Sequence, residues 1–110
     1  MRTRLTALAL ATALLVGCKG QPLPPDRLDY AGHWSGPGIE LVIGLDGGVA
    51  YERASGTGRV QITGPIQGFE GDDFVVGVMT IKTTFDVTVP PTQEQGTWTM
   101  TVDGVVLTRR

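Results

Sequence analysis

The sequence is poor in the residues that cross-link small domains or build metal sites. Its 110 residues include one Cys and one His. A single Cys cannot close an intramolecular disulfide, and one Cys with one His cannot supply the ligands of a structural zinc site. Charged residues make up 18% of the chain, with a formal net charge of −2. Because no basic stripe is available to neutralise phosphates, the composition predicts no nucleic-acid partner.

Apolar residues, in contrast, are abundant enough for one folded domain. They make up 41% of the chain, and the mean hydropathy is +0.07, which is typical of globular rather than disordered proteins. The sequence contains no G-x-S-x-G, no phosphate-binding glycine loop and no H-E-x-x-H. These motifs carry well-known hydrolytic, nucleotide and zinc chemistry. We therefore expect a non-enzymatic protein without a cofactor or a metal.

The N-terminal segment predicts a secretory signal peptide. Arg2 and Arg4 precede an uncharged apolar run of 12 residues, Leu5 to Val16. A transmembrane helix needs about 20 apolar residues, so this run is too short to span a bilayer. The charged start followed by the apolar run is typical of a signal peptide, although a buried N-terminal helix is the alternative. We expect residues 1–17 to be absent from the mature chain.

The end of the apolar run carries a second signal. Leu15, Val16, Gly17 and Cys18 provide an aliphatic residue, a β-branched residue, a small residue and a thiol in sequence. This pattern resembles the lipobox of bacterial lipoproteins. The resemblance implies cleavage between Gly17 and Cys18, and attachment of a diacylglycerol and a fatty acid such as palmitate to Cys18. Acyl chains in the membrane would then anchor the protein; the alternative is an incidental cysteine behind an ordinary signal.

The residues after Cys18 predict where the protein is sent and how far it stands from the membrane. Lys19, rather than Asp, follows the cysteine, and by resemblance to the sorting rule of enterobacterial lipoproteins this implies the outer membrane, facing the periplasm. Residues 18–29 contain three prolines, so we expect the lipidated Cys and an extended tether of roughly 30 Å. The alternative is an ordered arm packed on the domain through Leu23 and Leu28.

Residues 30–110 predict an all-β domain. Short runs of β-branched and aromatic residues alternate with Gly, Pro and Asp at intervals of about 8 to 12 residues, and no window has helical periodicity. We expect a small antiparallel β-barrel or sandwich of about seven to eight short strands. The strands are expected at 30–35, 39–45, 49–54, 58–63, 73–79, 83–89, 96–102 and 105–109.

Two hairpins are predicted from turn residues and apolar alternation. Asp103-Gly104 favours a two-residue type I′ turn, with Trp98, Met100, Val102, Val105 and Leu107 on the core face. Between Leu45 and Val49, a three-residue loop with Gly48 in the left-handed conformation would keep both apolar residues on the core face.

The middle of the domain predicts a further reversal. Around Phe74 the apolar residues have even numbers, whereas around Phe85 they have odd numbers. A reversal of the chain near residues 79–82, through a loop with an even number of residues, would place both sets on the same face of the sheet. Pro90-Pro91 is expected to end the following strand. The glycine-rich stretch 64–73 is expected to be a loop. The apolar residues predicted to reach the core from these segments are Ile66, Phe69, Phe74, Val76, Val78, Phe85 and Val87.

Few residues are candidates for chemistry. His33 could act as an acid or a base, but the more common role of such a residue is a surface or strand-edge histidine. Glu70, Asp72 and Asp73 provide oxygen ligands of the kind that Ca²⁺ prefers, yet they lack the alternating spacing of calcium loops. A solvated acidic turn is therefore the preferred interpretation.

The aromatic residues and a row of threonines are candidates for binding. Trp34, Trp98, Tyr30 and Tyr51 could line an interface, but in so small a domain we expect most of them in the core. Thr97, Thr99 and Thr101 could accept a partner strand if their strand lay at a sheet edge. We favour instead a solvated face of a central strand.

Gly32-His33-Trp34 resembles the Gly-x-Trp of the first lipocalin strand. That resemblance implies a Trp that closes one end of a barrel. Together these features predict a lipid-anchored envelope protein whose β-domain binds a protein or an envelope component. The alternatives are a lipocalin-like carrier of small ligands and, with less support, an envelope hydrolase.

Overall fold

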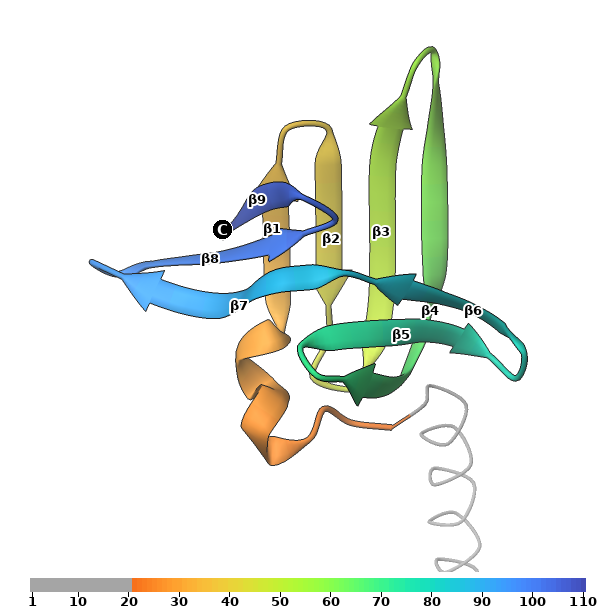
Figure 1. Cartoon of the computed structure of the whole chain (residues 1–110), viewed down its shortest axis with the longest axis horizontal. Coiled ribbons are helices and arrows are strands. Elements are labelled where there is room, and N and C mark those ends of the chain that lie inside the picture. Colours follow the sequence, from red (N-terminus) through yellow and green to blue (C-terminus); the bar gives the residue numbers. More distant parts are fainter. Residues whose placement is uncertain (1–20) are drawn as a thin grey trace, which may run out of the picture.

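A computed structural model describes residues 21–110, which form one antiparallel sheet and a short helix (Figure 1). The order of elements is η1 (Pro25–Tyr30, a 3-10 helix), β1 (Gly32–Gly36), β2 (Ile39–Ile43), β3 (Gly48–Ser55), β4 (Gly58–Glu70), β5 (Asp73–Val78), β6 (Ile81–Phe85), β7 (Val87–Glu94), β8 (Thr97–Val102) and β9 (Val105–Arg109). The prediction of an all-β antiparallel domain is confirmed, with nine strands.

The sheet curls into a half-barrel. Its strand order is β6-β5-β4-β3-β2-β1-β9-β8-β7, so β6 and β7 are the edge strands. In Figure 1, β1 to β4 run side by side while β5 to β8 cross them at a steep angle. The 13-residue strand β4 pairs with both β3 and β5, and its register shifts between Ile66 and Gly68. A bulge of this kind bends a strand, which lets β4 turn the sheet over on itself.

Apolar side chains from both parts of the sheet meet in a single core. The ring of Tyr51 on β3 meets that of Phe85 on β6 edge to face, with centroids 4.8 Å apart. Phe85 in turn stacks on Phe74 of β5 at 4.9 Å. The other buried core residues are Leu23, Tyr30, Trp34, Ile39, Leu41, Ile43, Val49, Ile66, Val76, Val87, Met100, Val102 and Leu107. Close packing of these side chains holds the curled sheet together.

The last hairpin has the predicted turn. Asp103 and Gly104 both have positive φ, 51° and 81°, as a type I′ turn requires, and Val102 lies opposite Val105. Of the five residues predicted on the core face, three are buried, while Trp98 and Val105 are partly buried against the core.

The predicted reversal between β5 and β6 is also present. A two-residue turn, Met79-Thr80, joins the strands and places Phe74 opposite Phe85. The loop length is even, as the change of apolar parity demands. Val78 was expected in the core and is instead 59% exposed, because the hairpin extends beyond the strands that it covers.

The turn between β2 and β3 differs from the prediction in register. Ile43 lies opposite Val49, and the three-residue loop is Leu45-Asp46-Gly47, closed by a bond from the Gly44 N–H to the Gly48 carbonyl. Gly47, not Gly48, has the positive φ of 87°, and Leu45 is exposed. The Asp46 side chain accepts a hydrogen bond from the Gly48 N–H, which favours the observed register.

Three predicted boundaries were wrong. The stretch expected as a loop, 64–73, is mostly the second half of β4, although Ile66 and Phe69 do contact the core as expected. The expected strand 83–89 is divided at Asp86 between β6 and β7. Pro90 and Pro91 lie within β7 rather than ending it. Proline is tolerated there because β7 is an edge strand with register shifts on either side of Val89.

Candidate functional site

The predicted acylation site, Cys18 with the cleavage residue Gly17, lies outside the described residues. The described chain begins at Gln21, whose carbonyl oxygen would be 2.1 Å from a Cβ placed on Gly47. Two residues later, Leu23 is buried in the core and its N–H bonds to the Leu45 carbonyl at 3.0 Å. Residues 21–23 are therefore fixed against the β2–β3 turn.

The predicted extended tether is not what the structure has over residues 23–29. Pro25–Tyr30 is a 3-10 helix that begins with proline at its first position and ends in buried Tyr30. Proline favours a helix start because its fixed φ suits the first turn and its missing N–H needs no acceptor there. The alternative of an ordered N-terminal arm is correct for this part of the chain, although Leu28 stays exposed.

Trp34 and Arg109 attach the end of this arm to the sheet. The indole N–H of Trp34 donates to the Tyr30 carbonyl at 2.9 Å. The Arg109 guanidinium donates to the Ala31 carbonyl at 3.0 Å and lies over the rings of Trp34 and Trp98, at 5.4 and 4.6 Å. Trp34 is thus fully buried beneath the arm, and its hydrogen bond couples the first strand to the helix.

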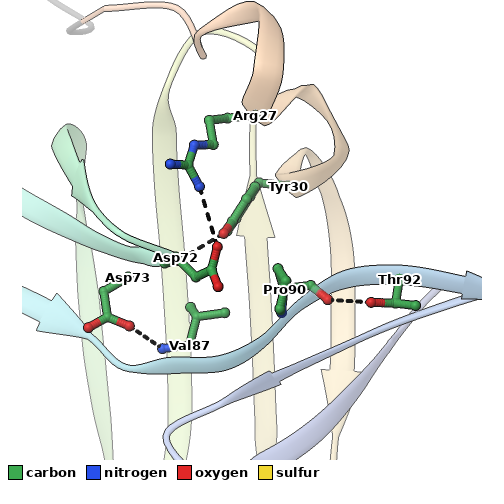
Figure 2. Close-up of polar contacts among 7 residues, drawn as sticks. All are labelled: Arg27, Tyr30, Asp72, Asp73, Val87, Pro90 and Thr92. Atoms are coloured by element: carbon green, nitrogen blue, oxygen red, sulfur yellow. Dashed lines mark hydrogen bonds and ion pairs between the residues drawn. The ribbon is translucent and has the colours of Figure 1, made fainter.

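The acidic turn between β4 and β5 attaches the same arm from the other side (Figure 2). The Tyr30 hydroxyl donates to the Asp72 carbonyl at 2.8 Å, and Arg27 forms an ion pair with the Asp72 carboxylate at 3.7 Å. Burial, followed by the charge of Asp72, raises the pKa of Tyr30. The Asp73 carboxylate accepts the Val87 N–H at 2.7 Å. Within residues 21–110, no group of three or more metal-ligating side chains converges.

His33 lies in a polar cluster on the outer face of β1 and β2. Its Nε2 is 2.6 Å from Glu40 Oε1, while the Ser35 hydroxyl donates to Glu40 Oε2 at 2.7 Å. Arg110 approaches the same carboxylate at 3.7 Å. The Ser35 hydrogen bond, and next the His33 hydrogen bond, lower the pKa of Glu40. Glu40 is therefore the shared acceptor of the cluster.

This geometry does not pair Ser35 with His33 as a nucleophile and its base. A serine nucleophile needs its hydroxyl bonded to a base such as histidine, whereas Ser35 donates to Glu40. The sequence pointed to His33 but missed its partners. The β1–β2 hairpin carries the signal that would have found them, because its Pro37-Gly38 turn places Ser35 directly opposite Glu40.

The polar cluster borders one of two adjoining hollows on the outer face of β1 to β4. One of about 310 Å³ is lined by His33, Glu40, Gln61 and other residues of these strands. A neighbouring hollow of about 470 Å³ shares the side chains of Val42, Ala50 and Thr63 with it. We call this surface, from His33 to Thr63, the outer groove. The opposite face of the same strands carries buried core residues.

The threonine row is not available for strand addition. Thr97, Thr99 and Thr101 lie on β8, which pairs with β7 on one side and β9 on the other. The interpretation as a central strand is correct. Among the aromatic candidates, Tyr30, Trp34 and Tyr51 are buried, as expected for most of them.

The described residues contain no helix long and apolar enough to cross a bilayer. No family model matches the chain, and it matches neither a curated protein nor a solved structure.

Proposed function

We propose that the chain is a lipid-anchored envelope lipoprotein whose β-domain binds a protein or an envelope component without performing chemistry. Residues 1–17 serve as its signal peptide, and acylated Cys18 is its first mature residue. The observation that carries the proposal is the sequence Leu15-Val16-Gly17-Cys18 at the end of the apolar run. Lys19 favours the outer membrane, with the domain facing the periplasm.

The packed arm supports a domain held close to the bilayer. Only Lys19 and Gly20 stand between Cys18 and Gln21, where contact with Gly47 begins. Three residues of extended chain cover about 10 Å at most. The domain would therefore stand within about 10 Å of its anchor, rather than at the end of a long tether.

The outer groove is the best-supported binding surface. It combines an ionised carboxylate, a histidine and exposed amide and hydroxyl groups with the apolar side chains of Val42 and Ala50. In binding sites, a small number of placed polar groups fixes the orientation of what is bound and provides specificity. The carrier alternative would need room inside the sheet, where Phe74, Phe85 and the other core residues lie, so we do not propose it.

Intact mass measurement tests the anchor. Protein extracted from membranes should have the mass of residues 18–110 plus a diacylglyceryl group, with or without a further acyl chain. The mass of the whole chain with a free thiol would contradict the proposal.

Crosslinking in intact cells tests the groove. A photo-reactive residue at Gln61, which lines the groove, should give discrete adducts, because a partner seated there brings reactive groups within reach. The matched control is Gln93, another exposed glutamine, on the distant strand β7. Equal adducts at both positions, or none at Gln61, would contradict binding in the groove.

A further inference from the structure

The hairpin between β5 and β6 ends in three exposed apolar side chains. Val78, Met79 and Ile81 are 59%, 85% and 82% exposed. We call them the apolar tip. In Figure 1 the tip projects beyond the strands behind it. Contiguous exposed apolar groups of this kind mark a contact surface more often than they serve folding.

The backbone of the tip is also unfavourable for an apolar residue. Met79 has a φ of 56°, a left-handed conformation that favours glycine or asparagine. The carbonyl of Met79 accepts a hydrogen bond from the Gln67 side-chain amide at 3.2 Å, which fixes the turn. Since the turn would form more readily with glycine, the methionine side chain is best explained by something that it contacts outside the domain.

Short contacts place the apolar tip on the same side of the sheet as the start of the described chain. Gln21 adjoins Gly47, and the Gly47 carbonyl accepts the Ile66 N–H at 2.8 Å. The next residue, Gln67, bonds to Met79 in the tip. Cys18 is three residues before Gln21, so an anchor at Cys18 lies within about 10 Å of this side of the domain.

We propose that the apolar tip inserts into the lipid leaflet that holds the acyl chains of Cys18. This inference rests on the proposed acylation and adds a second, non-covalent contact with the same bilayer. Lys82 is exposed and lies opposite Gly77, next to the tip. With the tip inserted, its positive charge would lie among the anionic headgroups. Apolar insertion and a flanking positive charge are the two contributions that bind peripheral proteins to anionic membranes. The tip thereby sets the orientation of the domain, while the acyl chains hold it.

The test uses the acylated full chain with Met79→Cys, labelled with an environment-sensitive fluorophore. Acylation consumes the Cys18 thiol, so the label reports on position 79 alone. The matched control is Thr57→Cys, in the turn between β3 and β4 at the far end of the sheet. In phosphatidylethanolamine vesicles with phosphatidylglycerol, emission from position 79 should shift to shorter wavelength. Quenching by a lipid-attached quencher should be several-fold greater at position 79 than at position 57.

Each other outcome overturns the proposal in a recognisable way. Equal quenching at both positions, on protein that floats with the vesicles, rejects the insertion and leaves the acyl anchor intact. Labelling of two thiols, with protein that does not float, rejects the anchor and the insertion together.

A second variant separates insertion from mere proximity. The double variant Met79→Gly, Ile81→Ser removes two apolar side chains of the tip, and glycine suits the left-handed backbone of position 79. Its melting temperature should therefore match that of the unchanged protein. A label at Thr80→Cys in this background should lose its quenching. If quenching persists there, the apolar side chains do not insert.

Discussion

Cys18→Ser should release the protein from membranes and abolish its labelling by a clickable fatty acid. Only a thiolate is nucleophilic enough to take the diacylglyceryl group, and a serine hydroxyl is not. Each buried methylene contributes about 0.8 kcal/mol to membrane binding, so the two or three proposed acyl chains would account for essentially all of the attachment. The measurement is the share of protein in the membrane fraction, together with the fluorescence of the clicked label.

Lys19→Ser is the matched control, because it alters the neighbouring position and leaves the four residues Leu15 to Cys18 intact. It should keep both labelling and membrane association. Labelling that survives in Cys18→Ser would contradict acylation at this residue. Membrane association that survives without labelling would show that the domain itself, and not the acyl group, holds the protein.

Trp34→Ala should destabilise the domain by about 3–5 kcal/mol, as is typical for a fully buried tryptophan. Since small domains have a total stability of about 5–15 kcal/mol, much of the protein would unfold under mild denaturant. The substitution removes the hydrogen bond to the Tyr30 carbonyl and one of the two rings beneath Arg109. The free energy of unfolding is measured by chemical denaturation.

Trp98→Ala serves as the control, because Trp98 also packs on Arg109 but is only partly buried. It should cost clearly less stability. The two variants should also differ at the arm, where trypsin can cut after Arg27. Cleavage there should become rapid in Trp34→Ala and remain slow in Trp98→Ala. Equal losses in both variants would mean that Trp34 does not couple the arm to the sheet.

Apolar alternation and turn residues predicted the parts of the fold that they control directly. The pairing of Val102 with Val105 follows from Asp103-Gly104, and the reversal before Phe85 follows from the change of parity. Both rest on the two-residue period of a strand. A period of two cannot distinguish registers that differ by two residues, which is why Leu45 was placed in the core.

The arm and the second half of β4 were missed because tertiary contacts decide them. The arm residues have little apolar periodicity, and their position depends on Tyr30 meeting the β4–β5 turn and on Arg109, some 80 residues away. Glycine lowers the strand propensity of residues 64–70, yet Gly64 and Pro65 pair with β3 and the following residues pair with β5. The candidate site could be predicted only in part. His33 is a candidate because of its residue type, whereas Glu40 and Ser35 become candidates only when the register of β1 and β2 is known.

The two edge strands carry a consequence for a protein crowded onto a surface. The proposed acylation of Cys18 would confine copies to two dimensions, where open sheet edges would collide often and long strands could add to one another. β7 lacks two backbone donors at Pro90 and Pro91, and β6 is five residues long with exposed Lys82. Both features disfavour the growth of fibrils from an edge. The first and last strands of the sheet are therefore protected against pairing with a neighbouring copy.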